Sequence, residues 1–210
     1  MSNLIVFIHG SGGSAANWQF QTDYFGPQQA IAIDLPGHGQ RLDTLSAEVT
    51  VADYAHAVHD IITHELQLNH PIIAGHSLGG AIALSMGLEY SQELGGLILV
   101  GTGARLRVLP SILEDARRAS LVTYRDWAAC NSFDIMTRLN EIHLPTLIIC
   151  GADDPMTPIK YSQYMHNRIQ GSTLRIIPHA GHEVMREQPE AVNRAIEEWL
   201  RQRNLSTEVE

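Results

Sequence analysis

The chain has 210 residues, enough for one well-buried core, and its length and ordinary composition fit a single domain. Its net charge is −9, from 14 basic and 23 acidic residues, and the basic residues form no stripe or tail. Nucleic acid and anionic membrane surfaces are therefore not expected as partners. Cys130 and Cys150 have neither metal-ligand spacing nor the density of a disulfide framework, so a reducing, cytoplasmic location is expected.

Short apolar runs alternate with amphipathic helical stretches, which is typical of a parallel sheet with helices on both faces. We expect strands at residues 3–8, 30–34, 71–74, 96–100, 145–150 and 173–177. Several are nearly continuous in Ile, Leu and Val, as strands buried on both sides are. No apolar run is long enough for a signal-peptide core or a membrane span. Thr50 and Asp53 predict a capping box that opens one helix, and Pro189 opens the last helix.

The most informative segment is IIAGHSLGGAIAL, residues 72–84, which runs from an apolar strand through a GxSxG turn into a helix. This context predicts a nucleophile elbow, a sharp turn that lifts the Ser77 hydroxyl clear of the sheet. Gly75 and Gly79 flank it because larger side chains would collide there. A serine hydroxyl is a poor nucleophile at neutral pH, so Ser77 needs a base and an orienting acid.

Eleven histidines compete for the role of base. His182 is preferred because it lies in AGHEVMREQPE, between the last strand and the last helix, where the edge of the sheet presents it to the elbow. His179 is the second candidate, although its apolar neighbours make it look like the end of the strand. His9, His38 and His76 remain as further alternatives.

The acid is expected in CGADDPMTP, after the fifth predicted strand. Asp153 and Asp154 are adjacent there, so only one of them can face the histidine, and the residues alone barely separate the two. Asp34, in DLPGHG, is interpreted as part of a structural turn. Backbone N–H groups are expected to form an oxyanion hole. Leu78 follows the nucleophile and supplies one donor, and in HGSGGS the preferred second donor is Ser11, followed by Gly12.

Five motifs, HG, DLPGHG, GHSLGG, GADDPMTP and GHEVMREQPE, occur in the order and approximate spacing of the α/β-hydrolase superfamily, which nearly the whole chain resembles. It looks most like small cofactor-free members such as carboxylesterases and enol-lactone hydrolases. In that family the acid occupies a GxxDxxxP pattern, which matches Gly151, Asp154 and Pro158 and implies Asp154 rather than Asp153. A second pattern, GHxxxxExPE, matches Gly181, His182, Glu187, Pro189 and Glu190.

Two departures from the family affect the expected architecture. The family normally has an antiparallel hairpin before the HG strand, whereas this sequence begins on that strand. We therefore expect an α/β-hydrolase fold with six mostly parallel strands in the order 2-1-3-4-5-6, within one domain over residues 1–210. The helical cap is reduced to about residues 102–144, enough for two or three short helices, and is expected to leave Ser77 fairly open. Because strand 30–34 becomes a sheet edge, both a monomer and a homodimer are consistent with the sequence.

The resemblance implies a serine esterase that needs no metal or cofactor and acts on small or short-acyl esters through an acyl-enzyme. Ser77 would attack, His182 would take its proton, and Asp154 would steady the imidazolium. Because the base must be neutral, activity is expected to fall below about pH 6 to 7. The residues predicted to bind substrate are Gly12, Trp18, His76 and Arg105.

Alternatives on the same scaffold are a lyase or carbon–carbon bond hydrolase that uses the same triad, and a non-catalytic ligand receptor. The lyase would need cationic side chains over its pocket, which Arg105, Arg107, Arg117 or Arg118 would supply.

Overall fold

A computed structural model describes residues 4–207 of the protein and contains one six-stranded sheet in the order β2-β1-β3-β4-β5-β6. All five strand pairs are parallel. The predicted order and the predicted strands are confirmed, and β3 continues past Ala74 to His76. Asn3, predicted in the first strand, lies outside the described residues. The strands are β1 (Ile5–Ile8), β2 (Ala30–Ile33), β3 (Ile72–His76), β4 (Gly96–Val100), β5 (Thr146–Gly151) and β6 (Thr173–Ile177).

Helices connect the strands, and the two predicted starting points are confirmed. Thr50 Oγ1 accepts the N–H of Asp53, whose carboxylate accepts the N–H of Thr50, so the capping box is present. The α-helices are α1 (Gln19–Phe25), α2 (Val51–Asp60), α3 (Leu78–Glu89), α4 (Pro110–Ala119), α5 (Leu121–Ser132), α6 (Ile159–His166), α7 (Val184–Glu187) and α8 (Pro189–Thr207). Short 3₁₀ turns are η1 (Ala15–Trp18), η3 (Ser91–Glu93) and η4 (Leu139–Glu141), and a π-helical turn η2 (Ile61–Glu65) follows α2.

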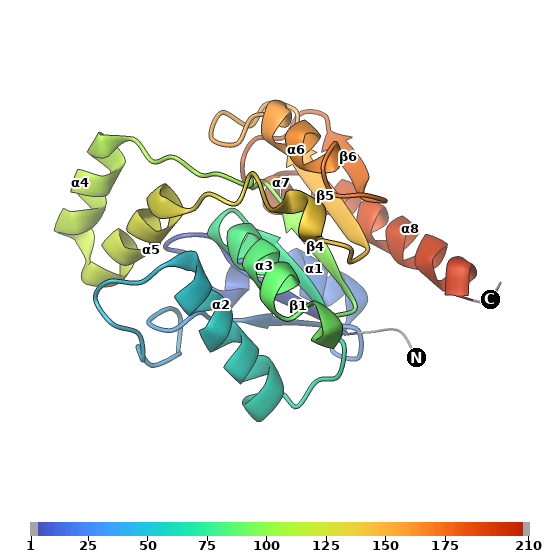
Figure 1. Ribbon diagram of the computed structural model, residues 1–210, viewed down its shortest axis with the longest axis horizontal. Helices are drawn as coiled ribbons and strands as arrows, with labels where there is room; N and C mark the ends of the chain where they lie inside the picture. The colour runs from blue at the N-terminus through green and yellow to red at the C-terminus, as the bar shows by residue number, and fades with distance from the viewer. Residues whose placement is uncertain (1–3, 208–210) are drawn as a thin grey trace.

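The sheet has a hydrophobic core on each face because successive strand residues point to opposite sides. Val6 and Ile8 belong to the core covered by α2, α3 and α6, whereas Ile5 and Phe7 belong to the core covered by η1, α7 and α8. Figure 1 shows α3 in front of the strands and α1 behind them. Burial of both faces explains why the inner strands β1, β4 and β5 are almost entirely apolar rather than alternating with polar residues.

The segment between β4 and β5 forms the small cap expected for residues 102–144. It contains α4, α5 and the short turn η4, and an antiparallel bridge joins Arg105, before α4, to Asp134, just after α5. Figure 1 shows α4 and α5 together, projecting from one side of the sheet. Within residues 4–207, no helix combines the length and apolar character needed to cross a membrane.

The parallel topology brings the predicted motifs to one edge of the sheet. The carboxyl ends of β1, β3, β5 and β6 all point the same way, because every strand pair is parallel. The loops that leave these ends carry residues 9–14, Ser77, residues 152–158 and residues 178–183. Ligand sites of open parallel sheets lie at this edge.

Candidate active site

Ser77 occupies a strained turn between β3 and α3. Its φ of 53° and ψ of −112° lie outside the regions that residues with side chains usually adopt. The Ser77 N–H donates to the carbonyl oxygen of Val100 (3.0 Å), and the Thr102 hydroxyl donates to the carbonyl oxygen of Ser77 (2.8 Å). Its neighbours therefore hold Ser77 in this conformation, which is the expected geometry of a nucleophile elbow.

The two glycines of the elbow have no room for a side chain. A Cβ on Gly75 would lie 2.0 Å from the carbonyl oxygen of Gly79. A Cβ on Gly79 would lie 2.3 Å from the carbonyl oxygen of Ile8. Both collisions are with backbone atoms, which cannot rotate away as a side chain can. The GxSxG spacing is therefore required by the close packing of α3 against β1 and β3.

His182 and Asp154 form a hydrogen-bonded pair at the same edge of the sheet. Nδ1 of His182 lies 2.9 Å from Oδ2 of Asp154. The other carboxylate oxygen, Oδ1, accepts the N–H groups of Met156 (2.8 Å) and Thr157 (2.9 Å), and the Thr157 hydroxyl donates to Oδ2 (2.7 Å). Burial opposes ionisation of Asp154, but hydrogen bonds from His182 and Thr157 outweigh it and hold its pKa well below the ordinary value.

This arrangement assigns the tautomer of the imidazole. An ionised carboxylate can only accept, so Nδ1 of His182 carries the hydrogen and Nε2 is left with a free lone pair. Nε2 is the nitrogen that a general base uses in a serine triad. His182 and Ser77 line the same cavity.

The competing acids and the second candidate base lie elsewhere. Asp153 and His179 are both exposed, and neither lines the cavity that holds Ser77. Asp34 accepts the N–H groups of Ala15 (2.7 Å) and Gln40 (3.1 Å), so it stabilises a turn, as expected.

The other candidate histidines are engaged by the protein. Nε2 of His9 accepts the N–H of Leu35 (3.1 Å), and His38 contacts Asp126 through Nε2 (2.8 Å). His76 contacts the carbonyl oxygen of His182 through Nε2 (2.9 Å). Burial lowers the pKa of His76 to about 3, so its ring is neutral and donates this hydrogen bond. His76 therefore helps to fix the loop that carries His182.

The loop around His182 is also held from its other side. The Glu187 carboxylate accepts the N–H groups of Gly181 (2.6 Å) and Glu183 (3.0 Å), the residues that flank His182. This contact gives a structural reason for the glutamate in the GHxxxxExPE pattern.

The turn at residues 10–13 packs directly against the elbow. A Cβ on Gly10 would lie 3.2 Å from Cβ of Ser77, and the Gly13 N–H donates to the carbonyl oxygen of Gly10 (3.1 Å). The Gly12 N–H donates to Oδ2 of Asp126 (2.9 Å), so it is not free to bind an oxyanion. Within residues 4–207, the Ser11 N–H donates to no protein acceptor. Of the two predicted donors in this turn, Ser11 is therefore the one that remains available.

Leu78 lies at the first position of α3, where backbone N–H groups have no partner within the helix. Its N–H adjoins the nucleophile, and the start of a helix favours negative charge.

A cavity of about 390 Å³ lies over these groups. Its volume is at the lower end of the range for small-molecule sites. Ser77 is only 7% exposed, so the expectation of a fairly open serine is wrong. The reason is that the small cap still reaches the site. The lining residues are Gly10, Ser11, Gly12, Gly13, Asn17, His76, Ser77, Ile112, Trp127, Met156, His182 and Glu183.

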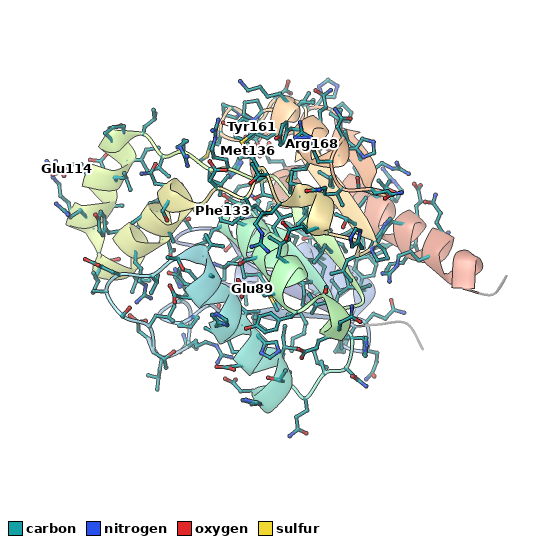
Figure 2. The ribbon with its side chains drawn as sticks, viewed as in Figure 1. Glu89, Glu114, Phe133, Met136, Tyr161 and Arg168 are labelled. Atoms are coloured by element: carbon teal, nitrogen blue, oxygen red, sulfur yellow. The ribbon has the colours of Figure 1, made fainter. Side chains whose placement is uncertain are left out.

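Two of the predicted substrate-binding residues lie outside this cavity. Trp18 is completely buried, and its ring lies 4.6 Å from that of Phe7, so it belongs to the core. Arg105 lines a separate pocket of about 290 Å³ with Met136 and Tyr161. Figure 2 shows Met136 and Tyr161 close together. Both predictions are wrong, because η1 packs Trp18 beneath the sheet and the start of the cap directs Arg105 toward α6. Gly12 and His76 do line the cavity.

Sequence reasoning missed several residues of the site. Thr157 binds Asp154, and its signal was a hydroxyl three residues after an aspartate in a turn. Asp126 binds the turn at residues 10–13, and Ile112 and Trp127 line the cavity, but cap residues have no motif that reveals these contacts. In the described part of the chain, no group of three or more His, Cys, Asp or Glu side chains is arranged to hold a metal ion.

Comparisons with known proteins identify the family of this chain. The sequence model of the alpha/beta hydrolase family matches residues 5–129, and a model described as TAP-like protein matches residues 116–209. A putative 2-succinyl-6-hydroxy-2,4-cyclohexadiene-1-carboxylate synthase of Bacillus subtilis is 25% identical, over 95% of this chain and 90% of the relative. A putative carbamate hydrolase, RutD, of Variovorax paradoxus is 27% identical, over 93% of this chain and 91% of the relative.

Among solved structures, a thermophilic esterase superposes with a TM-score of 0.85 at 33% sequence identity. The superposition covers 94% of this chain and 89% of the esterase.

Proposed function

Because the chain belongs to the α/β-hydrolase family, we propose that it is a serine esterase that cleaves small or short-acyl carboxylic esters through an acyl-enzyme. The observation that carries the proposal is that two residues line the same cavity: Ser77, which has a strained backbone, and His182, which is hydrogen-bonded to the carboxylate of Asp154. The similarity to a thermophilic esterase supports ester hydrolysis over the other reactions of this fold.

Acylation uses the groups around Ser77. Nε2 of His182 removes the proton from the Ser77 hydroxyl as Oγ attacks the ester carbonyl carbon. The negative charge that forms on the carbonyl oxygen is held by the N–H groups of Ser11 and Leu78. Collapse of the tetrahedral intermediate breaks the bond to the alkoxy oxygen, which takes the proton from His182. Asp154 stabilises the imidazolium while it carries that proton.

Deacylation repeats these steps with water. Nε2 of His182 removes a proton from a water molecule that attacks the acyl carbonyl carbon, and the same two N–H groups hold the oxyanion. The intermediate then releases Ser77, whose oxygen recovers its proton from His182. The products are one alcohol and one carboxylic acid for each ester and water consumed.

The cavity lining favours small neutral substrates. Apolar side chains of Ile112, Trp127 and Met156 face the space over Ser77, and neither Arg nor Lys is among the described lining residues. Glu183 adds an acidic group. A strongly anionic substrate, as the lyase alternative requires, would find no cationic partner there. The volume of about 390 Å³ suits an ester with a short acyl chain.

A substrate panel tests this proposal. Acetyl, butyryl and octanoyl esters of 4-nitrophenol, a small lactone and a small carbamate are compared on the wild type and on Ser77→Ala. We expect kcat/KM to be highest for acetyl or butyryl ester, and Ser77→Ala to lose at least about 10³-fold. Octanoyl ester as the best substrate would contradict the substrate class. If Ser77→Ala kept most of the activity, the mechanism would be contradicted. If the carbamate had a higher kcat/KM than every ester, carbamates and not esters would be the substrate class.

A further inference from the structure

The cap helix α5 contacts the turn at residues 10–13 through two side chains. Oδ2 of Asp126 accepts the Gly12 N–H (2.9 Å), and Sγ of Cys130 lies 3.6 Å from Oγ of Ser11. Asp126 and Cys130 are four residues apart, so both lie on one face of α5. Ser11 and Gly12 are the two central residues of the turn that the Gly13 to Gly10 hydrogen bond closes.

Asp126 is fully buried, and three donors surround its carboxylate. Besides the Gly12 N–H, His38 contacts Oδ2 (2.8 Å) and the Tyr54 hydroxyl donates to Oδ1 (2.5 Å). Burial opposes a charge on His38, but the hydrogen bond and the charge of Asp126 raise its pKa above the ordinary value. Nδ1 of His38 also faces the carbonyl oxygen of Pro36 (3.2 Å), so both ring nitrogens have acceptors.

The neighbouring residue fixes α5 to the body of the protein. Arg125 is only 1% exposed, and it donates to both carboxylate oxygens of Asp43 (2.8 and 3.1 Å). It also donates to the carbonyl oxygen of Pro36 (3.2 Å). The position of Asp126 is therefore set by the loop after β2 as well as by the cap itself.

Gly12 has no side chain of its own to anchor the turn, and Asp126 is the side chain that binds its N–H. Gly12 has a φ of +66°, and a Cβ built on it would meet no atom within 4 Å. The Ser11 N–H belongs to the preceding Gly10–Ser11 peptide plane, so its direction depends on where the whole turn lies relative to the elbow. The hydrogen bond from Gly12 to Asp126 anchors the residue next to Ser11 and so holds the whole turn in place against α5.

We propose that Asp126 is a positioning residue that holds the turn at residues 10–13 in the conformation that directs the Ser11 N–H toward the oxyanion. The inference rests on the proposed esterase mechanism, since it assigns Ser11 to the oxyanion hole. Asp126 does not touch substrate, because it does not line the cavity. It acts through the Gly12 N–H, so a residue of the cap helix α5 influences the rate of the chemical step.

Three variants separate positioning from general stability. Asp126→Ala removes the acceptor of the Gly12 N–H. Asp126→Asn retains an acceptor there, because two donors meet at Oδ2 and orient the amide oxygen toward them. Tyr54→Phe is the matched control, since it removes a hydrogen bond from the same carboxylate but leaves the Gly12 contact in place.

The assay is steady-state hydrolysis of 4-nitrophenyl acetate, with thermal unfolding to verify that each variant is folded. Loss of one oxyanion donor costs about 10²–10³-fold in kcat, so we expect Asp126→Ala to lose about 10- to 100-fold, because the Ser11 N–H is misdirected rather than removed. KM is expected to change by less than about threefold, since the contact matters mainly in the transition state. Asp126→Asn and Tyr54→Phe are expected to keep kcat within about threefold.

Several results would overturn the inference. Asp126→Ala that keeps its kcat, or Tyr54→Phe that loses as much as Asp126→Ala, would reduce Asp126 to a structural role. Hydrogen exchange of the Gly12 amide in the wild type tests the contact even if Asp126→Ala does not fold. We expect slow exchange, and exchange at the rate of an exposed amide would refute the contact. If the wild type shows no turnover that depends on Ser77, the proposed function fails instead, and Gly12 exchange still tests the contact.

Discussion

Replacement of Asp154 by Asn changes the chemistry of one atom while keeping the size of the side chain. Oδ1 accepts two backbone N–H groups, from Met156 (2.8 Å) and Thr157 (2.9 Å), whereas Oδ2 faces Nδ1 of His182 (2.9 Å). An amide oxygen can accept those two N–H groups, but an amide nitrogen cannot. The Asn side chain is therefore oriented with its NH₂ group toward His182.

This orientation forces the wrong tautomer on the imidazole. The amide N–H donates to Nδ1 of His182, so the ring keeps its hydrogen on Nε2 and cannot take a proton from Ser77. A loss of about 10⁴-fold in kcat follows, the magnitude known for this change in a serine triad. It corresponds to about 5.4 kcal/mol of activation free energy.

The assay is hydrolysis of 4-nitrophenyl acetate at neutral pH, with near-ultraviolet circular dichroism to verify the fold. The adjacent Asp153→Asn is the matched control, because Asp153 is exposed and lies outside the cavity. We expect it to keep kcat within about twofold, as surface substitutions away from a site usually do. A folded Asp154→Asn variant that retains more than a tenth of the wild-type kcat would refute the tautomer argument.

Three further predictions concern stability. Trp18→Ala is expected to destabilise the protein by about 3–5 kcal/mol in urea denaturation, with an unchanged KM, and a raised KM would return Trp18 to the substrate site. Gly79→Ala is expected to give no soluble, folded protein on expression, because its Cβ would lie 2.3 Å from a carbonyl oxygen. Normal yield and Tm would contradict the packing argument. The unfolded state protonates His76 near its ordinary pKa of about 6.5, whereas the folded state does so only near pH 3. As pH falls through this window, the free energy of unfolding of the wild type is therefore expected to decrease by up to about 1.4 kcal/mol per pH unit relative to that of His76→Gln. If the free energies of unfolding of the two proteins change with pH in parallel, the lowered pKa of His76 is excluded.

The sheet could be predicted from the sequence because its signal is local and dense. Strands buried on both faces are continuous runs of Ile, Leu and Val, and each run ends in a motif with its own turn chemistry. Parallel pairing then leaves few arrangements, so the predicted strand order is also the observed one.

The parts of the candidate site that the sequence could predict are those on strand ends. Residue chemistry alone barely separates Asp154 from Asp153, because the choice depends on which side chain turns toward His182. The resemblance to a family favoured Asp154, and Asp154 is the one in contact with His182.

The cap explains most of the remaining errors. Ile112 and Trp127 close over Ser77, and Asp126 reaches the turn at residues 10–13, through contacts between segments more than 30 residues apart. Helical periodicity indicates that such residues are apolar or amphipathic, but it does not indicate what they pack against. Trp18 is an error outside the cap: it is predicted to bind substrate, but it is part of the core.

Trapping the acyl-enzyme tests the central claim most directly. Wild type and Ser77→Ala are mixed with 4-nitrophenyl acetate, quenched in acid within milliseconds to seconds, and analysed by intact mass and peptide mapping. We expect wild type to gain one acetyl group on Ser77 while the substrate lasts, and Ser77→Ala to gain none. Hydrolysis by wild type with no adduct at any time, or with the acetyl group on another residue, would contradict the account.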